Sequence, residues 1–81
     1  MALVWVRVLA DDRFITHQGV PMTPAMTVAE LITTSKSMYG LEQKEGGRLY
    51  RVTESGRTLL PSSGTCEVLQ VRNGEPLDLV I

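Results

Sequence analysis

The two ends of this chain read as apolar strands, and this feature limits the folds open to it more than any other. Residues 2–10, ALVWVRVLA, alternate so that Val4, Val6 and Val8 share one face, which is typical of a strand with one side in a core. Residues 76–81, PLDLVI, alternate in the same way. Strands this apolar suit neighbouring central positions in a mixed sheet, and if they run parallel, everything between them serves as their crossover.

A single helix is predicted over residues 27–39. Thr27 stands three residues before Glu30, the spacing at which the two side chains reciprocally satisfy the free N–H groups of a helix start. Gly40 supplies a residue suited to the helix end. One face of this helix is predicted to pack on the sheet, and it carries Val28, Leu31, Ile32, Ser35 and Met38.

The remaining segments predict further strands. Residues 14–22 form a hairpin with the first strand, and Pro21 within them favours an edge position because it has no N–H to donate. Further strands are predicted at residues 48–53 and 58–60, one helical turn within residues 65–71, and a tight Asn-Gly turn at 73–74. The expected fold class is therefore α+β, with a mixed four- to five-stranded sheet and one long helix across one face.

Composition narrows the class of protein. Eighty-one residues allow one domain, spanning 1–81, because a second core would have nothing left to build it. The formal net charge of −1 provides no bulk attraction for nucleic acid or an anionic membrane, and no apolar run approaches the length of a membrane span. A lone cysteine, Cys66, favours a reducing compartment. We expect a cytoplasmic protein that does not bind nucleic acid and does not insert directly into a membrane.

The sequence offers no sign of catalysis. It contains no phosphate-binding glycine loop, no paired metal-binding histidines and no nucleophile elbow. His17 is the only histidine, with no partner in the sequence for metal or acid–base chemistry, and a solvated or hydrogen-bonded side chain is expected there. Cys66 is expected to be a buried, inert thiol. We expect a protein that is not an enzyme and needs no cofactor or metal.

The order of these elements resembles ubiquitin and the β-grasp proteins across nearly the whole chain. The matching residues are Thr27-Val28 at the helix start, Arg48-Leu49 at the third strand, GRTL at residues 56–59 and Leu69 to Leu79 at the end. The segments EGGRLYRV and VRNGEPLDLVI further resemble the YukD-like proteins that accompany type VII secretion in Gram-positive bacteria. This resemblance implies a ubiquitin-like β-grasp fold and a non-catalytic, protein-binding accessory or regulator of the secretion machinery.

Alternatives within the resemblance concern the end of the chain. Ubiquitin-like modifiers and sulfur carriers need a flexible Gly-Gly tail, whereas this sequence ends at Val80-Ile81 and its Gly46-Gly47 pair is internal. Conjugation is therefore not expected unless a tail has been trimmed. A ubiquitin-like head domain of a larger membrane protein of the same machinery stays open as well. An exposed strand edge would also allow pairing with a second copy of the chain.

A candidate protein-interaction surface centres on Trp5. Tryptophan is enriched among interface hot spots, and the charge of Arg7 on the same strand face indicates that this face meets water or a partner. The alternative is that Trp5 packs at the rim of the sheet. The interaction candidates are Trp5, Leu3, Arg7, Leu49 and Arg51.

A basic spot beside this surface is a second possibility, and its candidates are Arg48, Arg51 and Arg57. Such a spot would suit an acidic protein segment. The alternative is that these are ordinary solvated strand charges balanced by Glu54 and Glu67.

Overall fold

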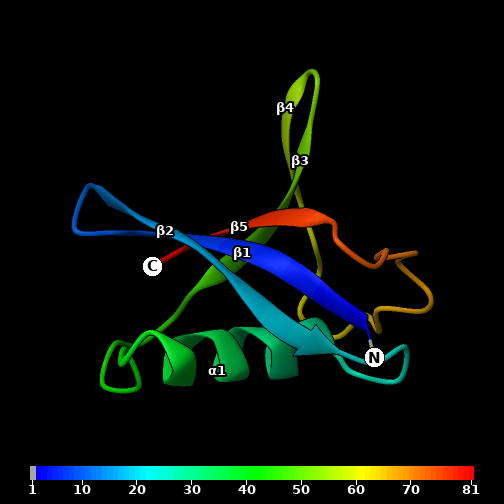
Figure 1. The fold of residues 1–81 in the computed structure, drawn as a ribbon, viewed down its shortest axis with the longest axis horizontal. Coiled ribbons are helices and arrows are strands. Elements are labelled where there is room, and N and C mark those ends of the chain that lie inside the picture. The colour runs from blue at the N-terminus through cyan, green and yellow to red at the C-terminus, as the bar shows by residue number, and fades with distance from the viewer. Residues whose placement is uncertain (1) are drawn as a thin grey trace.

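The computed structural model describes residues 2–81, which form one layer of sheet and one of helix (Figure 1). The elements in chain order are β1 (Ala2–Ala10), β2 (Arg13–Met22), α1 (Val28–Met38), β3 (Arg48–Thr53), β4 (Gly56–Leu59) and β5 (Pro76–Val80). The strands form one mixed sheet in the order β2-β1-β5-β3-β4. The predicted α+β class is confirmed, with five strands.

The two terminal strands are neighbours and run parallel. Val6 pairs with Leu77 and Val8 with Leu79, while β2 and β3 flank them in antiparallel fashion. The predicted central pair is therefore confirmed, and the hairpin, the helix and β3–β4 form the connection between its members. Pro21 lies on the edge strand β2 as predicted.

Helix α1 begins and ends close to its predicted limits. Thr27 is the N-cap and forms the expected capping box with Glu30. The helix buries Val28 and Leu31, together with Ser35, whose hydroxyl donates to the carbonyl of Leu31. Met38 was predicted on the packed face, but it is 41% exposed, unlike Leu31 and Ser35 on the same helix, which are fully buried. The prediction for Met38 was wrong.

Tyr39, the C-cap of α1, fastens the helix to the sheet. Its hydroxyl lies within hydrogen-bond distance of the carbonyl oxygens of Val6 on β1 and Thr16 on β2, beside the irregular register between these strands. Burial raises the pKa of the Tyr39 hydroxyl. One polar group thus locks the crossing of the helix over the β1–β2 hairpin.

The core lies between α1 and one face of the sheet. Its fully buried side chains include the predicted valines of β1, and its main members are Val4, Val6, Val8, Val20, Val28, Leu31, Leu49, Leu77 and Leu79. Leu49 was a candidate for the interaction surface, but it is completely buried because its position on β3 pairs with Leu79 on the helix side. Cys66 is buried as expected, and burial raises the pKa of its thiol.

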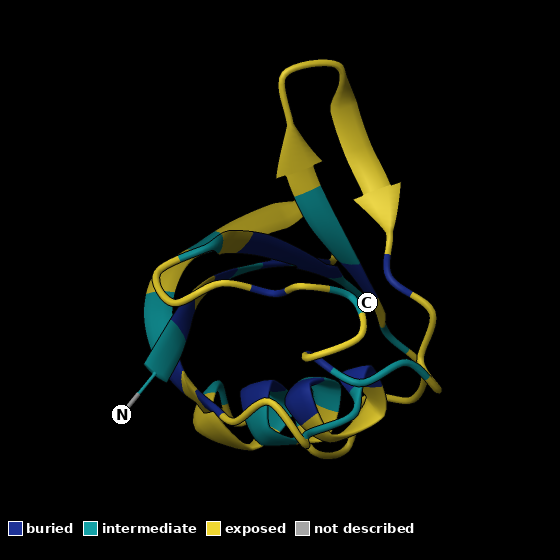
Figure 2. Ribbon diagram, turned by 90° about the vertical axis from the view of Figure 1, so that its right-hand side faces the viewer, coloured by how far each residue is buried: buried dark blue, intermediate teal, exposed yellow. Residues whose placement is uncertain are grey.

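The β3–β4 hairpin rises from the sheet on the side away from α1 (Figures 1 and 2). All of β4 is exposed, and Figure 2 shows the contrast with the buried strands above the helix. β4 and β2 are the two edges of the sheet. The hairpin therefore places its side chains above the uncovered face of the sheet.

The connection between β4 and β5 is held by turns. Within residues 65–71 a single turn forms, with the N–H of Leu69 donating to the carbonyl of Thr65. Gly74 has a φ of 78°, as the predicted Asn-Gly turn requires. The side-chain oxygen of Asn73 accepts a hydrogen bond from the backbone N–H of Leu3, which ties this turn to β1. Residues 2–81 contain no helix with the length and apolar character needed to span a bilayer.

Candidate protein-interaction surface

Within residues 2–81, no helix covers the face of the sheet opposite α1, which is called the outer face here. Strand alternation and register place on it Trp5, Arg7, Phe14, Arg48, Tyr50, Val52, Arg57, Leu59 and Asp78. Of the six large apolar side chains that are exposed in residues 2–81, four belong to this set: Trp5, Phe14, Val52 and Leu59. Exposed apolar side chains are therefore concentrated on one face, which is the usual character of an interaction surface.

Trp5 lies at the surface of β1, as predicted, with 45% of its area exposed. It pairs across the ladder with Gly19, where a side-chain carbon would lie 3.7 Å from the Trp5 ring and 3.5 Å from Leu3. Leu3 and Trp5 thus lie side by side over the space that Gly19 leaves. Half of the indole packs on the sheet and half faces outward, which suits a contact residue.

An ion-pair cluster occupies the middle of the outer face, formed by Arg7, Asp78 and Arg57, which we call the arginine–aspartate triad. Asp78 Oδ2 accepts from Arg7 Nη2 at 2.9 Å and from Arg57 Nε at 2.8 Å, and Oδ1 accepts from Arg7 Nε at 3.1 Å. The Asp78 side chain is 2% exposed, whereas those of Arg7 and Arg57 are 34% and 37% exposed. One carboxylate therefore anchors two guanidinium groups that still reach solvent.

Asp78 remains ionised although it is covered. Burial alone would raise its pKa, but the hydrogen bonds and positive charges of Arg7 and Arg57 outweigh this effect, and the pKa lies below its usual value. Arg57 reaches Asp78 from the β3–β4 hairpin. The triad consequently ties the hairpin to the central strands.

Phe14 completes this arrangement from β2. Its ring centroid lies 4.0 Å from the guanidinium carbon of Arg7 and 5.8 Å from that of Arg57. Both separations fall within the range of cation–π attraction. Phe14 is 51% exposed, so its ring holds the guanidinium groups in place and still presents an apolar surface.

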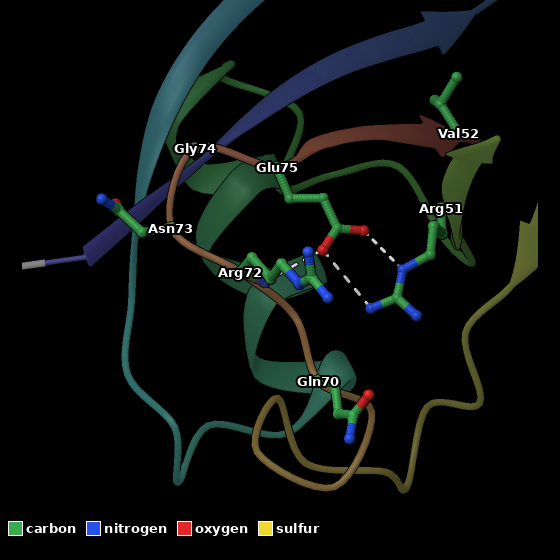
Figure 3. A pocket seen from close by; sticks show the side chains of 7 residues that line it. All are labelled: Arg51, Val52, Gln70, Arg72, Asn73, Gly74 and Glu75. Atoms are coloured by element: carbon green, nitrogen blue, oxygen red, sulfur yellow. Dashed lines mark hydrogen bonds and ion pairs between the residues drawn. The ribbon is translucent and has the colours of Figure 1, made fainter. Parts of the chain in front are cut away.

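Arg51 was a candidate for the same surface, and the structure places it elsewhere. It pairs with Leu77 and so belongs to the other face of β3. There it forms an ion pair with Glu75 and donates to the carbonyl of Leu69, beside an open hollow of about 420 Å³ (Figure 3). Arg51 therefore does not share a face with Trp5, because strand alternation turns it away from Tyr50.

The basic spot is likewise only partly assembled. Arg48 and Arg57 share the outer face, but Arg51 does not. Their charges were predicted to be balanced by Glu54 and Glu67, whereas Asp78 and Glu75 are the partners of Arg57 and Arg51. That part of the prediction was wrong.

Sequence reasoning missed Phe14, Leu59 and Asp78, although a signal existed. Asp78 interrupts the apolar strand PLDLV, and Arg7 interrupts VWVRV. A charge in the middle of an apolar strand needs a partner. Once β1 and β5 were predicted to be parallel neighbours, pairing Arg7 with Asp78 would have followed.

The titratable side chains of residues 2–81 form no metal-binding cluster. His17 is exposed, and within residues 2–81 no three His, Cys, Asp or Glu side chains gather as metal ligands would. The outer face instead offers aromatic rings, branched side chains and guanidinium groups. These are groups that make non-covalent contacts with another molecule.

Comparison with protein-family models and with curated proteins gives no match. Among solved structures, the designed protein dRafX6 is similar over 98% of this chain and 94% of its own, with a TM-score of 0.66 and 15% identity. The AtNBR1-PB1 domain is similar over 98% and 97%, with a TM-score of 0.56 and 13% identity. At these identities the likeness concerns the fold alone. The chain has the ubiquitin-like β-grasp fold.

Proposed function

We propose that this domain is a non-catalytic protein-binding module that docks its partner on the outer face. The observation that carries the proposal is the grouping of Trp5, Phe14, Val52 and Leu59 around the arginine–aspartate triad. Interfaces are enriched in aromatic residues and arginine at their centres, with apolar contact surrounding fixed polar groups. The fold likeness to a PB1 domain, at 13% identity, is compatible with this role.

The cellular role that we propose is that of a cytoplasmic accessory or regulator of type VII secretion. This part of the proposal rests on the resemblance of EGGRLYRV and VRNGEPLDLVI to the YukD-like proteins. The first segment includes most of β3, and the second includes β5 with the turn before it. Identifying the protein that this domain binds would test whether it acts with the secretion machinery.

Affinity capture from the native cell, followed by mass spectrometry, tests the docking surface. Wild type is compared with Trp5→Ala and with a matched control, Val68→Ala. Among the described residues, Val68 is the most exposed large apolar residue, at 78%, and it lies in the connection between β4 and β5 rather than on a strand of the sheet. We expect Val68→Ala to retain the partner and Trp5→Ala to reduce its recovery at least about fivefold, as for an interface hot spot.

Folding of each variant is checked first by the denaturant midpoint. A folded Trp5→Ala variant that recovers every partner at the wild-type level would overturn docking through this face. If wild type recovers secretion-machinery components and Trp5→Ala does not, the proposed cellular role is supported. If no such component is among the proteins that wild type recovers, the proposed cellular role is contradicted.

A further inference from the structure

The charges of the outer face are opposite in sign to those of the rest of the molecule. Arg7, Arg48 and Arg57 stand there against the single carboxylate of Asp78, leaving two net positive charges. The whole chain has a formal net charge of −1, so the remaining surface carries a net −3. Such a separation of charge orients an approaching partner and selects its sign.

We infer that the partner presents an acidic peptide segment in which carboxylates lie next to an aromatic or branched apolar side chain. This inference rests on the proposed function and specifies the partner's chemistry. Complementary charge on the partner would face the arginines, while its apolar side chain would contact the exposed rings.

The guanidinium groups retain donors for a partner. Among the hydrogen bonds of residues 2–81, Asp78 accepts from Arg57 only at Nε and from Arg7 at Nε and Nη2. The other N–H groups of the two arginines do not bond to Asp78. Arg48 is exposed and has no ion-pair partner in that part of the chain. Because Asp78 is covered by its arginines, a partner carboxylate would meet the guanidinium N–H groups before it meets that negative charge.

Trp5 and Phe14, two aromatic residues beside Arg7, provide the apolar contacts for the partner. Trp5 lies two residues before Arg7 on the same strand face, roughly 7 Å away along the strand, and the Phe14 ring lies on Arg7 itself. Aromatic rings and guanidinium groups thus alternate over a short distance. A segment with a carboxylate and an apolar side chain two residues apart when extended, or three to four apart when helical, matches this spacing.

This composition favours an acidic peptide over nucleic acid. A polyanion would be repelled by the net −3 of the surrounding surface, and nucleic-acid binding takes many basic contacts along a backbone. An acidic peptide needs only the local cluster. Its apolar side chain would cover the exposed areas of Trp5 and Phe14, which are 45% and 51%.

A defined peptide series tests the inference. The probe is a short synthetic peptide with phenylalanine flanked by glutamates, and the comparisons are the same peptide with lysines for glutamates and with serine for phenylalanine. Affinity is measured by titration at about 50 mM and about 500 mM NaCl. We expect the acidic aromatic peptide to bind best, and at least about fivefold more weakly at high salt.

Charge-reversed variants provide the matched comparison. Arg48→Glu reverses one positive charge on the outer face and leaves the three residues of the triad unchanged. Lys36→Glu makes the same reversal on α1, which covers the opposite face. We expect Arg48→Glu to weaken binding at least about fivefold and Lys36→Glu to leave it within about twofold. Both variants must keep the wild-type denaturant midpoint, and Arg48→Gln serves in place of Arg48→Glu if that variant unfolds.

The outcomes separate this inference from the proposed function. Equal binding of the acidic and basic peptides, binding of single-stranded DNA in preference to the acidic peptide, or self-association in place of peptide binding would overturn the acidic-segment inference. A native partner that Trp5→Ala loses but Arg48→Glu retains at about 50 mM NaCl, where charges are least screened, would also overturn it, yet would leave docking on the outer face standing. A partner retained by both variants would remove both.

Discussion

The two faces of this sheet are built from alternate residues of the same strands, yet they differ in kind. The inner face, covered by α1, is apolar and closed, with Val6, Val8, Leu77 and Leu79 fully buried. The outer face carries the arginine–aspartate triad and exposed rings. One strand therefore holds both a core residue and a candidate contact residue at successive positions, as Val6 and Trp5 show.

This difference separates stability from recognition. Changes on the inner face remove buried area or leave cavities, whereas most changes on the outer face meet solvent. Asp78 is the exception, because it is a covered charge on the otherwise open face. Substitutions on the two faces should thus fall into distinct classes of effect.

Leu31→Ala should have the largest effect on stability. The side chain is fully buried between α1 and the inner face, so truncation is expected to lower the free energy of unfolding by about 2–5 kcal/mol. Met38→Ala, on the same helix but exposed, should cost less than about 1 kcal/mol. Denaturant titration measures both, and equal midpoints for the two variants would contradict the described core.

Asp78→Ala should follow, with a loss of about 2 kcal/mol. Removing the carboxylate leaves two guanidinium groups without their shared acceptor, although partial exposure lets them hydrate. Arg48→Ala, also on the outer face but outside the triad, should be nearly neutral. A neutral Asp78→Ala variant would show that the triad does not hold the hairpin to the sheet.

The same carboxylate predicts a pH dependence. Because the folded-state pKa of Asp78 is lowered, its contribution to stability is present above the unfolded value of about 4 and is lost as pH falls through the folded pKa. The stability gap between wild type and Asp78→Asn should therefore be constant near neutral pH and shrink below about pH 4. Chemical denaturation across pH measures this gap; a gap that widens on acidification would contradict the lowered pKa.

Trp5→Ala should change stability by only about 1 kcal/mol, since half of the indole is already exposed. Its main effect is expected on partner recovery. A loss of stability as large as that of Leu31→Ala would place Trp5 among the structural residues and break the contrast between the faces. The denaturant midpoint, measured beside the capture experiment, distinguishes the two.

Gly19→Ala should have the smallest effect, a gain of about 0.5 kcal/mol from reduced freedom of the unfolded chain. Its side-chain carbon would meet Leu3 at 3.5 Å and Trp5 at 3.7 Å, both ordinary contacts. At Gly64 the same carbon would lie 2.7 Å from Leu69, so Gly64→Ala should be destabilising. Thermal unfolding of both variants tests whether the outer face has room that the packed connection lacks.

The sequence predicted the inner face better than the outer face, for a physical reason. Apolar periodicity and the capping box report local geometry and burial, so the parallel terminal strands, the helix start and the valine core were predicted correctly. Leu49 and Arg51 were misplaced because their orientation depends on the register of β3 against β5.

The triad was missed for a related reason. Its three residues come from β1, β4 and β5, and Arg57 reaches Asp78 across the sheet from a hairpin that rises above it. Local patterns do not encode such a reach. A cross-strand search for partners of the charges in apolar strands would have recovered the Arg7–Asp78 pair.

The most direct test of the outer face as the docking surface is a backbone and indole NMR titration with the acidic aromatic peptide. We predict that the largest chemical-shift changes will fall on Trp5, Arg7, Phe14 and Arg57, while Leu31 and the exposed side of α1 stay unchanged. The account would be contradicted by chemical-shift changes confined to α1 or to the free edge of β2. It would also be contradicted if saturating peptide caused no changes while a confirmed native partner bound at another surface.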